Sequence, residues 1–311
     1  MSINRRIFIK QTVMAGGAVL ATSIFPDFVF AEEAIDALTI LHTNDVHSRL
    51  EPFPMDGSNH AGLGGVAPRS RLISQIKKEE KNVLLLDAGD MFQGTPYFNI
   101  YKGEPEIKAM NMMQYDVGTI GNHDFDGGLE NLASQLSHAT FAMVNCNYNF
   151  DRTPLEGKVV PYTIIQKENI KIGILGVGIE LKGLVPDNLY GNIIYNNPIQ
   201  KANETADLLN KKGCDMIICL SHLGDKYFDN KVSDEILAKE CYDIDLIIGG
   251  HTHRFFNKPL VYNNRSKGNT VVNQVGWAGI QLGRLDYNFT RMKKKNLVRS
   301  HTVMIREKTS E

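Results

Sequence analysis

Short apolar runs recur along the chain, and segments with helical periodicity separate them. The runs are bounded by Gly, Asp and Asn, which is typical of buried strands. The predicted strands are Ala37–His42, Val83–Asp87, Val117–Ile120, Phe141–Asn145, Ile172–Val177, Met216–Leu220 and Leu246–Ile248. The predicted helices, several of which open on Pro or Asp, are Pro68–Lys81, Pro105–Met113, Gly128–Leu136, Pro198–Lys211 and Asp234–Cys241. This alternation predicts an α/β layered fold.

The pattern changes after residue 270 to strand-like pieces without helices between them. We predict strands at Thr270–Val275, Gln281–Phe289 and Val298–Arg306, with a hairpin turn at Arg291–Asn296. These pieces would complete a sheet. The sequence shows no internal repeat and no linker rich in Ser, Pro or Gly, so residues 32–311 are predicted to form one domain.

The first 31 residues have the features of a targeting segment. Arg5 and Arg6 precede an apolar stretch, Thr12–Phe25, and small residues follow up to Ala31. This pattern resembles a bacterial twin-arginine (Tat) export signal and predicts a periplasmic protein that begins near Glu32 after cleavage. The apolar run is shorter than the roughly 20 residues of a spanning helix. An uncleaved membrane anchor and a Sec-type signal are the alternatives.

Composition narrows the class of protein. Hydrophobic residues make up 42% and charged residues 22%, as in ordinary soluble proteins, and the net charge of -1 gives no reason to expect a nucleic-acid polymer as partner. The four cysteines, Cys146, Cys214, Cys219 and Cys241, lack zinc-ribbon or redox spacing. We expect buried thiols, with one disulfide left open as an alternative in an oxidising compartment. Opposite parity along one strand argues against a Cys214–Cys219 bond.

Residues of metal-binding type follow five of the predicted strands. One Asp-x-His or His-x-His motif is usually a coincidence of exposed residues, but the strand ends of an open α/β sheet share one edge, so five motifs there converge. Asp45 and His47 stand at i and i+2, where an extended chain points both side chains to the same side. Such a mixture of carboxylate, amide and imidazole groups needs a divalent cation to neutralise it. The residues are Asp45, His47, Asp90, Asn122, His123, Asp126, His222, His251 and His253.

The ordered motifs Asp-x-His, Gly-Asp-x-x-x-Gly, Gly-Asn-His-Asp, Ser-His and Gly-Gly-His-Thr-His resemble the calcineurin-like metallophosphoesterase superfamily. Asn44–His47 together with Gly121–Asp126 is similar to the 5′-nucleotidase branch, specifically to its N-terminal catalytic domain. The likeness runs from about Leu38 to Phe289. It implies a four-layered α/β/β/α sandwich.

The resemblance also implies a role for each residue of the site. The superfamily binds two divalent cations, and the residue types here suit Mn, Zn, Fe or Co without selecting one. Such a centre generates hydroxide that attacks phosphorus in line. The catalytic histidine would stabilise the transition state or protonate the leaving alkoxide. The implied assignments are Asp45, His47 and His253 to one metal; Asn122, His222 and His251 to the other; Asp90 as the bridge; His123 as the catalytic histidine; Asp126 as the acid that orients it; and Asn122 and His123 as substrate-binding residues.

The resemblance predicts a nucleotide phosphomonoester as substrate. Full-length 5′-nucleotidases carry a second, C-terminal domain with base-stacking aromatic residues, and this chain stops at Glu311, where that domain would begin. We therefore expect either broad activity on phosphate esters or a separate C-terminal-domain protein as partner. Candidate base-stacking residues, for which core packing is the alternative role, are Trp277, Phe255, Phe256 and Tyr97.

Other functions stay open at this point. Within the same fold the alternatives are a broader phosphatase, a 2′,3′-cyclic phosphodiesterase, a UDP-sugar hydrolase and a thiosulfohydrolase. A catalytically silent binding subunit is disfavoured because every ligand position, and His123, holds a competent residue type.

Overall fold

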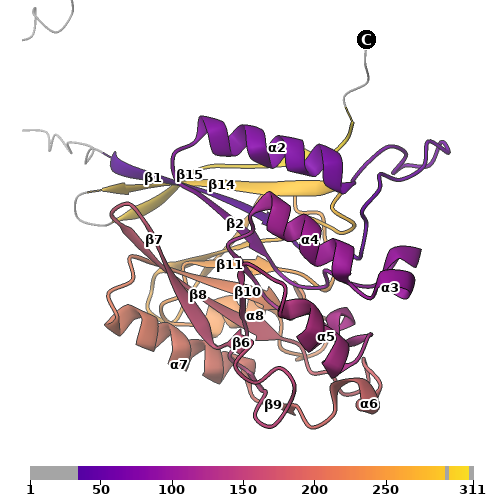
Figure 1. Cartoon of the computed structure of the whole chain (residues 1–311). Coiled ribbons are helices and arrows are strands. Elements are labelled where there is room, and N and C mark those ends of the chain that lie inside the picture. The colour runs from indigo at the N-terminus through magenta and orange to yellow at the C-terminus, as the bar shows by residue number, and fades with distance from the viewer. Residues whose placement is uncertain (1–33, 291–293, 308–311) are drawn as a thin grey trace, which may run out of the picture. The chain divides into compact units, whose positions relative to one another are not determined.

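Two β-sheets lie face to face in the computed structural model, which describes residues 34–290 and 294–307 (Figure 1). The predicted export signal and its boundary at residue 31 fall outside the described residues. Among the residues described, no helix combines the length and apolar character that a membrane span requires.

The first sheet has seven strands in the order β15-β14-β1-β2-β3-β4-β6. Its five parallel strands are β1 (Ala34–Thr43), β2 (Val83–Asp87), β3 (Val117–Gly118), β4 (Ala142–Val144) and β6 (Val159–Val160). The antiparallel strands are β14 (Gln281–Thr290) and β15 (Lys295–Met304). Two of the three predicted C-terminal strands thus complete this sheet, although β15 begins inside the predicted turn. The third, predicted at Thr270–Val275, belongs to the other sheet.

The second sheet has six strands in the order β12-β13-β11-β10-β8-β7. Its parallel strands are β8 (Ile170–Gly178), β10 (Met216–His222), β11 (Leu246–Gly249) and β13 (Asn269–Asn273). Antiparallel strands at the two edges are β7 (Tyr162–Lys167) and β12 (Leu260–Asn263). A small separate pair is formed by β5 (Tyr148–Asn149) and β9 (Ile194–Tyr195).

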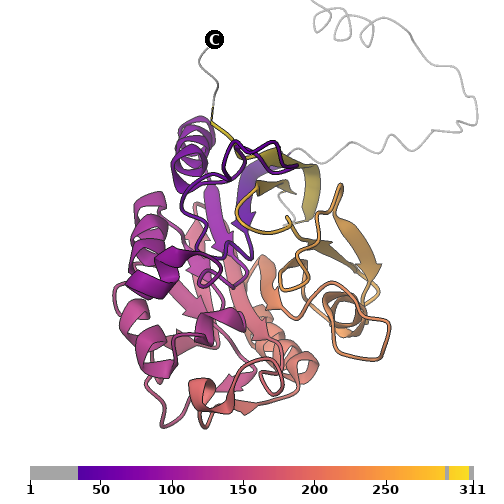
Figure 2. The same cartoon turned by 90° about the vertical axis from the view of Figure 1, so that its right-hand side faces the viewer.

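Helices cover the outer face of each sheet, as Figures 1 and 2 show. On the seven-stranded sheet lie α2 (Val66–Glu79), α4 (Glu104–Met113) and α5 (Leu129–Leu136). On the six-stranded sheet lie α7 (Pro198–Lys211) and α8 (Asp234–Glu240). Shorter helices are α3 (Pro96–Tyr101), α6 (Asp187–Tyr190) and the 3₁₀ turn η1 (His123–Phe125). The predicted four-layered α/β/β/α sandwich is confirmed.

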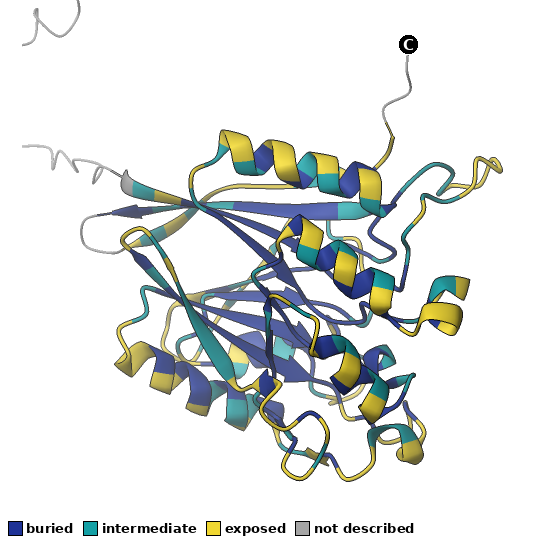
Figure 3. Ribbon diagram, viewed as in Figure 1, coloured by how far each residue is buried: buried dark blue, intermediate teal, exposed yellow. Residues whose placement is uncertain are grey.

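Successive side chains along the central strands point to opposite faces of each sheet, and they contribute to three apolar layers. In β2, Leu84 and Leu86 face the other sheet, whereas Leu85 packs under the helices of its own sheet. In β10, Ile218 faces the first sheet and Cys219 packs under α7 and α8. Strands with both faces covered are almost wholly buried, as Figure 3 shows in dark blue. All four cysteines are free.

The layer between the sheets also contains one histidine, His42 on β1. It is fully buried, and Asn273 of the other sheet donates from Nδ2 to its Nε2 over 2.8 Å. Burial lowers the pKa of His42 to about 3. His42 is therefore a neutral core residue at ordinary pH.

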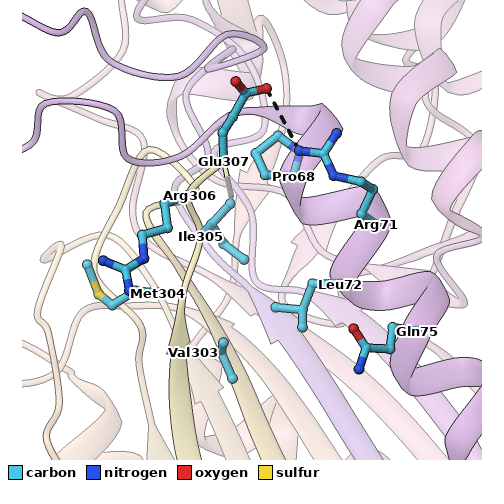
Figure 4. Close-up of a pocket in the computed structure, with 9 residues that line it drawn as sticks. All are labelled: Pro68, Arg71, Leu72, Gln75, Val303, Met304, Ile305, Arg306 and Glu307. Carbon is cyan, nitrogen blue, oxygen red and sulfur yellow. Dashed lines mark ion pairs between the residues drawn. The ribbon is translucent and has the colours of Figure 1, made fainter. Parts of the chain in front are cut away.

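A groove of about 490 Å³ opens between α2 and the end of β15 (Figure 4). Leu72 and Val303 line it, and Arg71 Nη2 lies 3.8 Å from Glu307 Oε1 at its rim. None of the predicted site residues lines this groove.

Candidate metal centre

The predicted site residues meet where parallel strands of both sheets end. From the seven-stranded sheet, Asp45 and His47 follow β1, Asp90 follows β2 and Asn122 follows β3. From the six-stranded sheet, His222 is the last residue of β10, and His251 and His253 follow β11. The predicted convergence at the carboxyl ends of the strands is found, and it spans two sheets.

The backbone at five of the predicted ligand positions is unusual. Positive φ occurs at Asp45 (50°), His47 (50°), Asp90 (56°), His251 (70°) and His253 (54°). The expectation of an extended chain at Asp45 and His47 is therefore wrong. Left-handed conformations of this kind are held by the surrounding structure and cluster at functional sites. Here the backbone N–H groups of Asp45 and His47 donate to the Gly89 and Asp90 carbonyls over 2.9 and 3.0 Å.

Asp45, His47 and His253 form one group of potential ligands. The Nε2 atoms of His47 and His253 lie 3.0 Å apart, and Asp45 Oδ1 lies 3.4 Å from Nε2 of His253. A second group consists of Asp90, His222 and His251. Asn122 joins it, because its Oδ1 lies 2.8 Å from Nδ1 of His251.

Asp90 lies between the two groups. Its Oδ2 is 3.1 Å from Nε2 of His222 in one group and 3.8 Å from Nε2 of His47 in the other. The Asp90 carboxylate is 1% exposed, so it is almost wholly removed from water. The position of this oxygen fits a bridging ligand.

The nitrogen and oxygen atoms of the site are placed better for binding a divalent cation than for hydrogen bonding among the side chains themselves. Nε2 of His222 is buried and makes no hydrogen bond within the described residues, although Asp90 and Asp45 oxygens lie 3.1 and 3.9 Å away. Buried polar atoms in proteins are almost always satisfied. An imidazole nitrogen that faces two carboxylates without a well-formed hydrogen bond to either fits a metal ligand.

The charges of the site are strongly coupled. Burial alone would lower the pKa of His222, but the Asp90 and Asp45 carboxylates outweigh it and raise the pKa to about 10. Burial would likewise raise the pKa of Asp90, but His222 and His47 hold it well below its usual range. Burial and neighbouring His222 lower the pKa of His251 to about 4. The Asp90 carboxylate thus stays ionised, as a metal ligand must.

Two residues that are not among the predicted ligands, Asp124 and Asn44, hold the loops and side chains of these ligands in place. Asp124 accepts backbone N–H groups on both oxygens: Asp90 and Gly121 donate to Oδ2 over 3.0 and 2.8 Å, and Phe92 donates to Oδ1 over 3.0 Å. Asn44 donates from Nδ2 to Asp45 Oδ2 over 2.6 Å. Both residues lie within the quoted motifs, but their contacts depend on the folded loops.

Close packing of the loops explains why the Gly-Asn-His-Asp motif begins with a glycine, Gly121. A Cβ atom added at Gly121 would lie 2.1 Å from Oδ1 of Asp90 and 2.6 Å from its backbone nitrogen. No side chain fits there without displacing the carboxylate between the two ligand groups.

His123 and Asp126 stand at the mouth of the centre. Nδ1 of His123 lies 2.9 Å from Oδ2 of Asp126, and this hydrogen bond raises the pKa of the imidazole. The backbone N–H of His123 donates to Asp90 Oδ1 over 2.8 Å. A hollow of about 270 Å³ opens beside them; its lining residues are His47, Arg49, Gln93, Gly94, His123, His253, Trp277 and Ala278.

The four aromatic candidates have different environments. Trp277 lines the hollow, and its ring stacks on His253 at 5.8 Å between centroids. Phe256 packs against the core under α7 and α8, Phe255 is 40% exposed outside the hollow, and Tyr97 donates to Glu51. Of the four, Trp277 alone lines this hollow.

The fold and the two ligand groups define a metallophosphoesterase. Residues 38–255 match the family described as calcineurin-like phosphoesterase. The chain belongs to this family, as the sequence motifs predicted, and the prediction of a phosphoester hydrolase is confirmed at this level.

Several 5′-nucleotidases are similar to this chain. The chain is 36% identical over 225 residues to a snake venom 5′-nucleotidase of Crotalus adamanteus, and 34% identical over 226 residues to the human 5′-nucleotidase. These matches cover 70% of this chain but 37% and 38% of the relatives. A 5′-nucleotidase precursor from Thermus thermophilus superposes with a TM-score of 0.78 at 30% identity, covering 87% of this chain and 55% of that one. The chain thus spans less than half the length of these curated relatives.

Proposed function

We propose that the chain is an exported phosphoesterase with a binuclear metal centre, and that it hydrolyses nucleotide phosphomonoesters. The observation that carries the proposal is the pair of ligand groups on either side of Asp90, with His123 and Asp126 at their mouth. The 5′-nucleotidase names of the relatives support the substrate class.

The ligand groups suggest which residues hold each cation. Asp45, His47 and His253 would hold one, Asn122, His222 and His251 the other, and Asp90 would contact both. When bound, two divalent cations supply charge that lowers the pKa of water and neutralises phosphoryl oxygens. The donor set of oxygen and imidazole nitrogen suits Mn, Zn, Fe or Co.

His123 would act on the leaving group. Asp126 accepts a hydrogen bond at Nδ1 of the imidazole and thereby raises its pKa, which favours the protonated ring. Protonated His123 can donate from Nε2 to the alkoxide oxygen as the ester bond to phosphorus breaks. Asn122 and His123 would contact the substrate, since both border the ligand groups and His123 lines the hollow.

Base recognition requires more than this hollow offers. Trp277 presents one flat ring beside His253, so the second face of a stacked base has no aromatic partner among the lining residues. A separate C-terminal-domain protein that supplies this face is part of the proposal. Copurification of the tagged protein from its native host without a stoichiometric partner would argue against it.

Export is supported by the twin-arginine pattern at Arg5 and Arg6 and by the presence of one relative in venom. We propose that residues 1–31 are a cleaved Tat signal, with a retained membrane anchor as the alternative, and that residues 32–311 form one periplasmic catalytic domain.

The test is a substrate panel with the metal-loaded protein. AMP, a 2′,3′-cyclic nucleotide, a UDP-sugar and p-nitrophenyl phosphate should be compared in the wild type, Asp90→Asn and the exposed control Asp151→Asn. We expect AMP to be the best substrate and its turnover to be lost only in Asp90→Asn. Turnover of p-nitrophenyl phosphate alone would indicate a broader phosphatase. If no ester is hydrolysed by protein with both metals bound, the proposal is wrong.

A further inference from the structure

Arg49 lines the same hollow as His123, His253 and Trp277. It is half-buried, and it follows the ligand His47 by two positions. Its Nε is buried and makes no hydrogen bond within the described residues. Among the described residues, no carboxylate forms an ion pair with Arg49. The hollow therefore contains a guanidinium that the described part of the chain does not neutralise.

Aromatic contacts hold this guanidinium at the rim. Its Cζ lies 4.0 Å from the centroid of the Phe53 ring. The Phe53 ring packs edge-on against Trp277 at 5.8 Å, and Trp277 in turn stacks on the ligand His253 with an angle of 9° between the rings. A cation over an aromatic face is attracted to it and loses conformational freedom. The side chain of Arg49 is thus tied to the metal centre through two rings.

The chemistry of this position favours an oxyanion. A guanidinium presents forked N–H donors that match the oxygens of a phosphate group. A purely structural role, in which the stem of Arg49 covers Phe53, would account for the cation–π contact. It leaves the buried Nε without a partner, whereas a phosphoryl oxygen in the hollow would supply one.

We propose that Arg49 is a substrate-binding residue that donates to the phosphoryl oxygens of a phosphate ester in this hollow. The inference rests on the proposed phosphoesterase function, because the ester must lie between Arg49 and the ligand groups. It assigns to Arg49 a share of phosphate binding beyond that of Asn122 and His123. Phe53 is then a positioning residue for Arg49.

The test measures binding of inorganic phosphate, the reaction product, by titration calorimetry on the manganese-loaded protein. Arg49→Gln should weaken phosphate binding about 10- to 100-fold, since it removes charge-assisted hydrogen bonds. Arg49→Lys keeps the charge without the fork and should fall between Arg49→Gln and the wild type. Phe53→Leu should weaken binding less than Arg49→Gln. The control Arg71→Gln, on the exposed face of α2, should match the wild type.

Metal content and melting temperature of each variant show whether it is folded and loaded. Unchanged phosphate binding in loaded Arg49→Gln, or no phosphate binding by the wild type, would overturn the inference. The proposed function has a separate readout. If phosphate binding depends on Arg49 but no ester is hydrolysed, this inference holds and the proposed function is wrong. If AMP is hydrolysed but Arg49→Gln binds phosphate as tightly as the wild type, the proposed function holds and this inference is wrong.

Discussion

Nδ1 of His251 lies 2.8 Å from Oδ1 of Asn122, although the two residues follow strands of different sheets. A metal ligated by both residues would therefore bind the two sheets together at their carboxyl ends. Ligands that bind the folded state and not the unfolded state raise its stability.

We expect removal of the metals to lower the melting temperature of the protein. Scanning calorimetry with and without a chelator should show a clear decrease, which manganese in excess should reverse. In Asn122→Ala the difference between the metal-loaded and metal-free protein should shrink, because one bond between the sheets is lost. Equal melting temperatures in the presence and absence of metal would contradict a metal site that links the sheets.

Asp126→Asn should lower kcat about 10- to 100-fold, since the carboxylate orients His123 and favours its protonated form. KM and metal content should change little, because Asp126 contacts neither group of ligands directly. Steady-state kinetics with AMP and elemental analysis of the purified variant measure both effects. A loss of metal that accounts for the loss of activity would assign Asp126 to metal binding instead.

Asp124→Asn should weaken metal binding about 10- to 100-fold. The wild-type carboxylate accepts three backbone N–H groups with its two oxygens, whereas an amide places an NH₂ group against at least one of these donors. The loop that carries Asp90 would then shift. Titration of the metal-free protein with manganese measures the change, and Asp151→Asn is the matched control on the surface. Wild-type affinity in Asp124→Asn would show that the loop holds its shape without this carboxylate.

His42 should make the protein less stable in acid. Its pKa is about 3 in the folded protein and about 6.5 when exposed, so the unfolded state binds one proton more between these values. The free energy of unfolding should therefore decrease by up to about 1.4 kcal/mol for each pH unit below 6.5, until the pH approaches 3. Other groups titrate in the same window, so the measurement is a comparison of urea unfolding between the wild type and His42→Gln. The variant should show a shallower dependence on pH; identical slopes would mean that His42 is not protonated on unfolding.

The export prediction can be tested with conservative substitutions. Replacing Arg5 and Arg6 together by Lys should leave full-length precursor in the cytoplasm, since the Tat pathway reads the arginine pair itself. Cell fractionation and the N-terminal sequence of the periplasmic form give the result. Normal export of the double variant would point to a Sec-type signal.

The central strands were predictable because both of their faces are covered. Val83–Asp87 has the predicted bounds, and Leu246–Gly249 differs by one residue. The edge strands Tyr162–Lys167 and Leu260–Asn263 were missed, because they are partly or largely exposed and carry polar residues that break a continuous apolar run. Their pairing is decided by the neighbouring strand and not by their own sequence.

At the site, as in the sheets, the sequence predicts what a local pattern decides and misses what tertiary contacts decide. The convergence of the predicted ligands could be anticipated because each lies at or just after the end of a strand, and parallel strands end at one edge. The contacts of Asp124 and the role proposed for Arg49 could not be found in this way. Asp124 acts through backbone groups of one other loop, the one after β2, and through Gly121 of its own loop. The environment of Arg49 depends on its burial and on the ring of Phe53.

The residues of each predicted ligand group lie far apart in the sequence, so they are synthesised at different times. Asp45 and His47 are synthesised early, but His253 of the same group follows more than 200 residues later. In the second group, Asn122 is likewise synthesised well before His251. Neither ligand group is complete on a nascent chain that stops short of residue 251. Metal binding by the proposed centre would therefore begin only after residue 251 has been synthesised, and the cations present from that moment on would compete for it.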